Sequence, residues 1–388
     1  MNDDLKITEV NSVKEYDEHV RNLLVTLLGL GSSATRNDQG TRKLGATSIS
    51  FNLLSMYPSI PMTTLRPISW ASILGEMLGF IRGETNVQAF KELGTNVWNA
   101  NAKEPAWKNN ALAPNEGDLG PIYGKQWRKW TDTKLLHERS SLRELGYTRM
   151  GHVSRLTGDL PHEGPTGDGP LYVWVKEVDQ LMEALNRIKA NPNDRRAVIS
   201  AWNPGDMDFM ALPPCHVMMQ LTTVPYAQHK YGSYTDGASD FEIDFNENYP
   251  EQVVSDTVEP NSSGETVPRY ALNLVVTQRS QDTLLGRAYN IPAYATLLRL
   301  FAHLLEMAPG NLEFNVGDQH LYSNHGAAAD EVTCRESLDK DEEGEKLFQL
   351  SIVGVDKFED LDTLTADNFI LTNQVTHDKL ESDTKMTV

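Results

Sequence analysis

The 388-residue sequence predicts an α+β fold. Apolar runs of strand length gather in the middle of the chain, at 197–202, 216–223 and 270–278, whereas helical patterns lie mainly on either side of them. Helices and strands do not alternate strictly, so a repeated strand–helix–strand design is not expected. An apolar fraction of 39% and a charged fraction of 23% are typical of a soluble globular protein that can bury a core.

Three helices are expected before the first of these strands. Ser12 and Glu15 have capping-box spacing and begin an amphipathic helix. The second helix follows Pro67 and is apolar on nearly all sides, with Glu76 as its polar exception, so it should be buried. The third is expected over 177–190, where apolar residues recur on one face.

The later part of the chain adds a helix, a strand and two insertions. A long apolar helix is expected to begin at Pro292, a residue suited to a first helical turn, and to reach about Met307. A strand follows at 312–316. The stretches 131–170 and 225–268 are rich in Gly and in polar or charged residues, and we expect solvated surface loops there.

Charge and cysteine content exclude several classes of protein. A formal net charge of −19 argues against a general nucleic-acid-binding surface, which needs clustered Lys and Arg. Two cysteines cannot build a disulfide framework, which indicates a reducing intracellular compartment. No apolar run is long enough for a membrane span, and the N-terminus lacks the pattern of a secretory signal. We therefore expect a cytoplasmic protein.

Cys215 is the first candidate for chemistry. It follows Pro213 and Pro214 and precedes His216, at the beginning of an apolar strand. A thiolate nucleophile needs cationic or hydrogen-bonding neighbours. Taken alone, a single intracellular cysteine is more often an inert core residue, so the surrounding sequence has to decide.

Six short runs lie in order along the chain, and together they resemble the thymidylate synthase superfamily. They are GDLGPIYGKQWR at 117–128, DRR at 194–196, LPPCH at 212–216, QRSQD at 278–282, LGRAYN at 285–290 and GDQHLYSNH at 317–325. The resemblance implies one catalytic domain over 1–388, with insertions at about 131–170 and 225–268 and a C-terminal tail at about 366–388. It also implies a mixed β-sheet packed with helices, one face of which forms a homodimer interface.

The resemblance implies a covalent one-carbon transfer to dUMP. Addition of Cys215 to C6 makes C5 nucleophilic, and C5 then takes a methylene from the co-substrate 5,10-methylenetetrahydrofolate. Catalytic roles fall on Cys215, Glu76, Tyr123, His216 and Asn290. The side-chain amide of Asn290 matches O4 and N3–H of uracil rather than cytosine. Glu76 would organise protons with a pKa raised by its apolar helix.

The remaining implied contacts form two sets. The nucleotide would be bound by Arg195, Arg196, Gln278, Arg279, Ser280, Asp282, Asn290, His320 and Tyr322. The folate would be bound by Val97, Trp98, Asn101, Leu212, Asp282, Leu285, Gly286, Tyr289 and Val388, although core packing is an alternative for the apolar members. Arg195 and Arg196 would reach the other subunit's phosphate, and Arg36 or Arg42 would add a further phosphate contact. The histidines show no metal-ligand spacing, so no metal is expected.

Two departures from the family pattern bear on the outcome of the reaction. Asn101 stands where synthases carry a second Trp, and the tail at 376–388 is polar and lacks Tyr and Pro. Both favour access of water to the ring's exocyclic methylene, so the sequence favours a phage-type dUMP hydroxymethylase, which releases 5-hydroxymethyl-dUMP and tetrahydrofolate. The alternatives are a thymidylate synthase, in which the folate supplies hydride to give dTMP, and a non-catalytic scaffold that binds through the acidic insertion.

Overall fold

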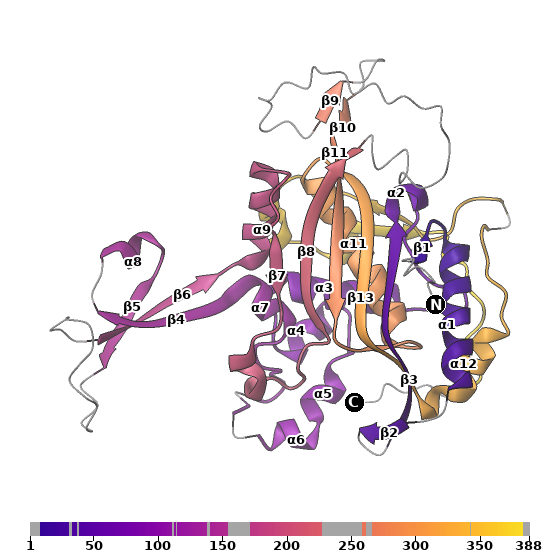
Figure 1. Cartoon of the computed structure of the whole chain (residues 1–388), viewed down its shortest axis with the longest axis horizontal. Coiled ribbons are helices and arrows are strands. Elements are labelled where there is room, and N and C mark those ends of the chain that lie inside the picture. The colour runs from indigo at the N-terminus through magenta and orange to yellow at the C-terminus, as the bar shows by residue number, and fades with distance from the viewer. Residues whose placement is uncertain are drawn as a thin grey trace, which may run out of the picture.

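A computed structural model of the chain describes residues 8–30, 33–36, 39–110, 112–113, 115–137, 140–153, 171–226, 258–260, 266–341 and 343–382. The α+β expectation is confirmed, because one mixed sheet forms the centre and helices pack against it (Figure 1). Within these ranges, no helix is both long enough and apolar enough to cross a membrane.

The central sheet has eight strands in the order β1-β3-β13-β11-β8-β7, with β2 paired to β3 and β12 paired to β13. Strands β11 and β13 are parallel, whereas β8 and β3 run antiparallel to their neighbours β11 and β13. The strands are β1 (Thr8–Val10), β2 (Ser33–Arg36), β3 (Gln39–Asn52), β7 (Val198–Ser200), β8 (His216–Pro225), β11 (Tyr270–Gln278), β12 (Gln281–Asp282) and β13 (Ala308–Tyr322).

The two faces of this sheet differ in burial because side chains alternate along each strand. On one face, Leu274 and Phe314 are fully buried against the helices. On the other face, Val275, Thr277 and Glu313 are only half-buried. The sheet therefore has a packed face and a partly open face.

The packed face is covered by helices α1 (Val13–Gly29), α3 (Trp70–Arg82) and α11 (Gly286–Leu304). The predicted caps form: the side chain of Ser12 accepts a hydrogen bond at the start of α1. Helix α11 begins six residues before Pro292, so the predicted start is wrong. Pro292 lies within the helix, where it is buried on all sides, and packing tolerates the backbone hydrogen bond that a proline cannot make.

The insertion at 131–170 was expected to be a loop, and that expectation is wrong where the structure describes it. Strands β4 (Trp130–His137), β5 (Thr148–Val153) and β6 (Leu171–Val178) form a separate antiparallel sheet with α8 (Ser140–Glu144). We call this unit the arm; it extends away from the body (Figure 1). Trp174 of β6 is fully buried, which gives the arm a small core of its own.

Two further boundaries differ from the prediction. Helix α9 (Gln180–Ala190) begins three residues later than expected, because Asp179 caps it and the preceding residues belong to β6. In the second insertion, the described residues include the hairpin of β9 (Val258–Pro260) and β10 (Thr266–Pro268) rather than loop alone. The rest of 227–265 lies outside the described residues.

The smaller elements surround the sheet. They are α2 (Leu53–Met56), α4 (Val87–Glu92), α5 (Asn99–Lys103), α6 (Pro105–Lys108), α7 (Tyr123–Lys129), α12 (Gly326–Thr333), β14 (Gln349–Ile352), β15 (Phe369–Thr372) and four 3₁₀ turns. After β15 the tail runs back to the body, where the His377 amide donates to the Thr64 carbonyl at 2.8 Å. Val388 lies outside the described residues.

Candidate active site

Cys215 lies directly before β8, and its backbone is held by a helix from elsewhere in the chain. Its amide donates a hydrogen bond to the Tyr123 hydroxyl at 2.7 Å. Tyr123 is the first residue of α7. This helix approaches α3 so closely at Gly124 that a Cβ added there would lie 2.3 Å from the Phe80 carbonyl oxygen. The Tyr123 ring stacks on Phe80, with ring centroids 4.8 Å apart. Burial holds the pKa of Tyr123 well above its ordinary value, so its hydroxyl keeps its proton.

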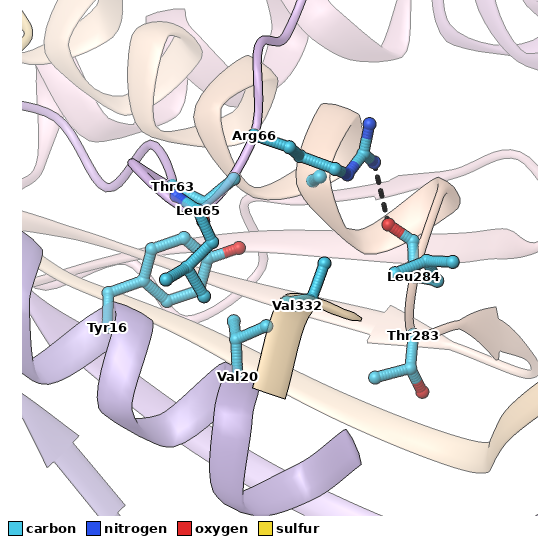
Figure 2. Close-up of a pocket in the computed structure, with 9 residues that line it drawn as sticks. Tyr16, Val20, Thr63, Leu65, Arg66, Thr283, Leu284 and Val332 are labelled. Carbon is cyan, nitrogen blue, oxygen red and sulfur yellow. Dashed lines mark hydrogen bonds between the residues drawn. The ribbon is translucent and has the colours of Figure 1, made fainter. Parts of the chain in front are cut away.

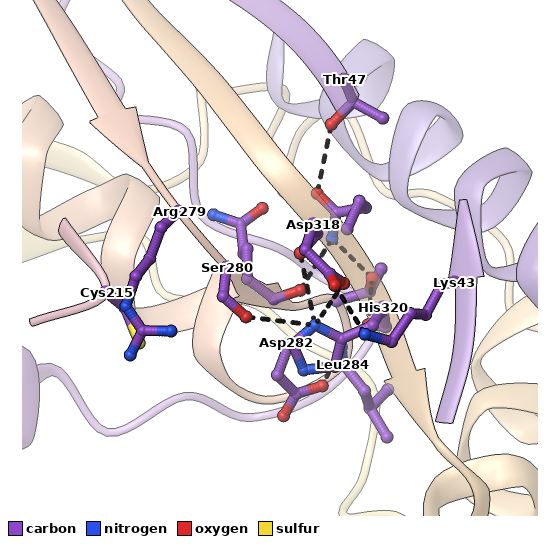
Figure 3. Close-up of polar contacts among 12 residues, drawn as sticks. Lys43, Thr47, Cys215, Arg279, Ser280, Asp282, Leu284, Asp318 and His320 are labelled. Carbon is purple, nitrogen blue, oxygen red and sulfur yellow. Dashed lines mark hydrogen bonds and ion pairs between the residues drawn. The ribbon is translucent and has the colours of Figure 1, made fainter. Parts of the chain in front are cut away.

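Arg279 brings a positive charge to the thiol. Its Nη2 lies 3.7 Å from Cys215 Sγ (Figure 3). The guanidinium also donates to the carbonyls of Pro214 at 3.0 Å and Pro213 at 2.9 Å, so the two prolines fix its position. A cation held at this distance stabilises a thiolate, and the arrangement is typical of a reactive cysteine.

A group of buried titratable side chains lies behind the thiol. Burial raises the pKa of Glu76 to about 7, and the nearby indole N–H of Trp98 partly opposes this shift. Burial lowers the pKa of His216 to about 4, with a smaller opposing effect from its hydrogen bond with Asn290. At neutral pH the site therefore holds an uncharged imidazole and a carboxyl group near its midpoint, a combination suited to proton transfer.

A polar chain follows Arg279 on its other side (Figure 3). Ser280 Oγ lies 3.5 Å from Nδ1 of His320, and Asp318 Oδ1 lies 3.3 Å from the same nitrogen. Lys43 of β3 pairs with Asp318 at 2.7 Å. The chain therefore links the turn after β11 with β13 and β3.

Asp282 and Tyr322 lie at the end of this chain. The Asp282 carboxylate accepts from the Leu284 amide at 3.1 Å and lies 3.9 Å from His325 Nδ1. The Tyr322 ring packs edge-on against both His320 and His325. These contacts fix the orientation of the carboxylate and of both imidazoles.

The residues expected to contact folate are either half-buried or almost fully buried in the structure. Val97, Leu212 and Tyr289 are half-buried against the core, whereas Trp98 and Leu285 are nearly covered. Gly286 begins α11, and a Cβ there would lie 3.6 Å from Asp282 Cβ. Asn101 of α5 is only 7% exposed. Core packing and a ligand-facing role are thus compatible for this set.

Three of the arginines considered for the phosphate have other surroundings within this single chain. Arg195 and Arg196 are exposed beside β7, and the Arg195 carbonyl accepts from Gln220 on the partly open face at 3.1 Å. The Arg42 guanidinium donates to the carbonyl of Leu28 at the end of α1. The Arg36 side chain lies outside the described residues.

Two residues of the site were missed from the sequence. The Tyr294 hydroxyl lies 3.0 Å from Nδ1 of His216. The available signal was its spacing, four residues after Asn290 on the same helix. Arg66 lines a cavity of about 10 Å³ beside the site, roughly the space for one water, and donates to the Leu284 carbonyl at 2.7 Å (Figure 2). No sequence pattern distinguished Arg66.

In the part of the chain that the structure describes, no three His, Cys, Asp or Glu side chains gather in a group that could hold a metal. The groups that the site does bring together are a cation-flanked thiol, a carboxyl group with a raised pKa, and a neutral imidazole beside an amide.

Comparison with known proteins identifies a family for this chain. A family model described as thymidylate synthase matches residues 14–386. The chain is 30% identical to the thymidylate synthase of Pseudomonas putida over 84% of the chain and 85% of that protein. It is 30% identical to the enzyme of Pseudomonas syringae pv. tomato over 78% of each.

Plant relatives are named as bifunctional proteins, with a dihydrofolate reductase as well as a thymidylate synthase. The chain is 29% identical to the bifunctional dihydrofolate reductase–thymidylate synthase of Daucus carota, over 94% of the chain but 54% of that protein. It thus spans about half the length of such plant relatives. With the match extending over nearly the whole chain, the protein belongs to the thymidylate synthase family.

Proposed function

We propose that the protein is a thymidylate synthase that converts dUMP to dTMP with 5,10-methylenetetrahydrofolate. The observation that carries this proposal is Cys215 Sγ at 3.7 Å from Arg279 Nη2, with the Cys215 amide tied to Tyr123. Relatives named thymidylate synthase that match along most of both chains support this reading over the hydroxymethylase favoured by the sequence alone.

The Cys215 thiolate attacks C6 of the uracil ring, forming a sulfur–carbon bond and moving an electron pair toward C5 and O4. The side-chain amide of Asn290, held beside His216, suits recognition of O4 and N3–H. Glu76, with a pKa of about 7, exchanges protons with the O4 region at neutral pH. Because His216 is neutral there, it orients Asn290 and Tyr294 without adding charge.

The nucleotide's sugar and phosphate lie along the polar chain in this proposal. Arg279 and Ser280 supply donors for the phosphate, while His320 and Tyr322 approach the 3′-hydroxyl. The exposed guanidinium groups of Arg195 and Arg196 complete the phosphate site of a second copy. The partly open face of the sheet supports such a homodimer, and we expect the dimer to act in the cytoplasm.

The residues present fit a folate beside the nucleotide. Half-buried Leu212 and Tyr289 offer apolar surface for ring stacking, and the oriented Asp282 carboxylate offers an acceptor for the N–H groups of a pterin. The bound folate supplies the methylene and, in a synthase, the hydride. The chain's own part is to hold this ring against C5 and to exclude water.

The second candidate function is the dUMP hydroxymethylase. The specific observation in its favour is Asn101, a small polar side chain that is 7% exposed and lies on α5, the helix that begins directly after Trp98. A space filled by Asn rather than Trp leaves room for water near C5. None of the relatives named above is a phage protein. A scaffold role through the acidic insertion falls mainly outside the described residues.

Product identity separates these functions. The purified protein is incubated with dUMP and 5,10-methylenetetrahydrofolate, and both products are identified by mass spectrometry. We expect dTMP and dihydrofolate in equal amounts. Formation of 5-hydroxymethyl-dUMP with tetrahydrofolate would replace the synthase by the hydroxymethylase, and absence of both products would refute one-carbon transfer. Cys215→Ala is the matched control, which should give neither product.

A further inference from the structure

The turn that carries Arg279 and Ser280 is closed by a side-chain bridge. Strand β11 ends at Gln278 and β12 begins at Gln281, so Arg279 and Ser280 alone connect the two strands. Gln281 Nε2 donates to Gln278 Oε1 at 2.6 Å across the base of the turn. Both glutamines are at most 2% exposed, so water does not compete for this bond.

The bridge is tied in turn to helix α11 by a buried arginine. Arg287 Nη1 donates to Gln281 Oε1 at 2.8 Å, and the residue is 1% exposed. Its Nε and Nη2 have no hydrogen-bond partner among the described residues. The guanidinium carbon lies 5.9 Å from the centroid of the Tyr16 ring, and among the described residues no carboxylate stands out as a counter-ion for it.

Stability alone does not account for an arginine at this position. Burying a cation without a counter-ion is unfavourable because its hydration is lost, and an aliphatic side chain would avoid that loss. Besides its contact with the Tyr16 ring, Arg287 donates its hydrogen bond to Gln281, one of the two glutamines that bridge the turn. Strand β13 adds a second restraint, since Gln319 Nε2 donates to the Gln281 carbonyl at 3.3 Å.

We propose that Arg287 is a positioning residue that fixes the Arg279–Ser280 turn through Gln281 and Gln278. This inference rests on the proposed function, because it takes that turn as the phosphate site. The turn lies between the thiol and the His320 end of the polar chain (Figure 3). Binding of a phosphate by Arg279 depends on where its guanidinium is held, because a displacement of about 1 Å lengthens an N–H···O contact beyond hydrogen-bond distance.

The test compares binding of dUMP with that of deoxyuridine, which lacks the phosphate, by titration calorimetry on the full chain. Arg287→Met removes the donor and keeps an unbranched apolar side chain. Arg299→Met is the matched control: Arg299 is also buried in α11, at 8% exposed, and donates to the carbonyls of Pro58 and Leu350 at 2.6 and 2.9 Å. The melting temperature of each variant is measured alongside.

We expect Arg287→Met to reduce the preference for dUMP over deoxyuridine by about tenfold, as expected for one weakened charge-assisted contact. Arg299→Met should keep the preference within about twofold, whatever its melting temperature. Arg287→Lys, which retains a cationic donor, should recover part of the loss. An unchanged preference in Arg287→Met would overturn the proposal, since a purely structural arginine changes only stability.

A second variant keeps the proposal testable if Arg287→Met does not fold. Gln281→Met removes the acceptor of the Arg287 hydrogen bond. An unchanged preference for dUMP over deoxyuridine in this variant would also refute the proposal. The double variant should lose no more than the larger single loss, because both changes remove one interaction; independent, additive losses would contradict the connection. If the wild-type protein binds deoxyuridine as tightly as dUMP, the phosphate site itself is wrong, and this is visible before any variant is made.

Discussion

The buried carboxyl group of Glu76 should make the protein less stable as pH rises, and Glu76→Gln should remove that loss. Its pKa is raised by burial to about 7 from an ordinary value of 4.5. Below the unfolded-state value the group is neutral in both states and has no effect. Between the two values the unfolded chain gains from ionisation that the folded site resists, so stability falls until pH exceeds the folded pKa.

The magnitude follows from the size of the shift. A rise from 4.5 to about 7 corresponds to about 3 kcal/mol, at about 1.4 kcal/mol for each pH unit. The Glu76 residue is only half-buried by its exposed area, so part of it still contacts solvent. Solvent there screens part of the charge, so we expect about 2 kcal/mol between pH 5 and pH 8.

The assay is urea unfolding of the wild-type protein and of Glu76→Gln at half-unit steps from pH 5 to 8.5. The difference in unfolding free energy between the two proteins should be near zero at pH 5 and grow in favour of the glutamine variant up to about pH 7.5. Asp17 and His216 also titrate abnormally, but they are present in both proteins and cancel in the difference. The variant should also lose turnover, because an amide does not exchange the proton.

A difference that stays constant with pH would refute the reasoning, since it would mean that Glu76 ionises in the folded protein as it does in water. A difference of the opposite sign would show that the carboxylate, rather than the carboxylic acid, is the stabilised form in the site.

Three further outcomes test other parts of the structure. Cys215→Ser should reduce product formation on the order of 1000-fold, while dUMP affinity measured by calorimetry changes only a few-fold; normal turnover would exclude the covalent mechanism. Gly124→Ala places a Cβ 2.3 Å from the Phe80 carbonyl oxygen and should destabilise the protein by about 3 kcal/mol in urea unfolding, and wild-type stability would show that α7 and α3 are farther apart than described. Arg128→Met removes donors to Asp179 at 2.9 Å and Asp362 at 2.8 Å and should lower stability by about 2 kcal/mol, whereas an unchanged melting temperature would mean that these ion pairs are solvated.

The sequence predicted best where local pattern and tertiary burial agree. Strand β11 was expected at 270–278 and lies there, because its alternating apolar residues face the helices. Strand β3 was not predicted at all. Its residues 39–48 include Arg, Lys and two Gly, and they are held in the sheet by pairing with β13, a partner some 270 residues away.

The residues of the candidate site also fall into two groups, those that the sequence indicated and those that it did not. Residues in recognisable runs, such as Cys215 and Arg279, lie together in the structure. Tyr294 and Arg66 stand outside those runs, and their contacts arise only when α11 and the segment before α3 pack against the sheet. The contribution of Arg195 and Arg196 stays a prediction, because it depends on a second copy of the chain.

The arm leaves the body and returns to it at one place. Helix α7 ends at Lys129, where the arm begins, and the arm ends beside Asp179, which pairs with Arg128 at 2.9 Å. The two ends are therefore held together by the body itself, whatever lies between them. For a segment closed in this way, doubling its length changes the entropy of closure by only about 0.6 kcal/mol.

The chain can consequently gain or lose length at this point with little effect on the rest of the fold. Tyr123 lies at the opposite end of α7, where it accepts the hydrogen bond of the Cys215 amide one helix length away from the start of the arm. The arm is thus a position at which chains of this family can diverge, or be shortened and exchanged by design, while the reactive centre keeps its geometry.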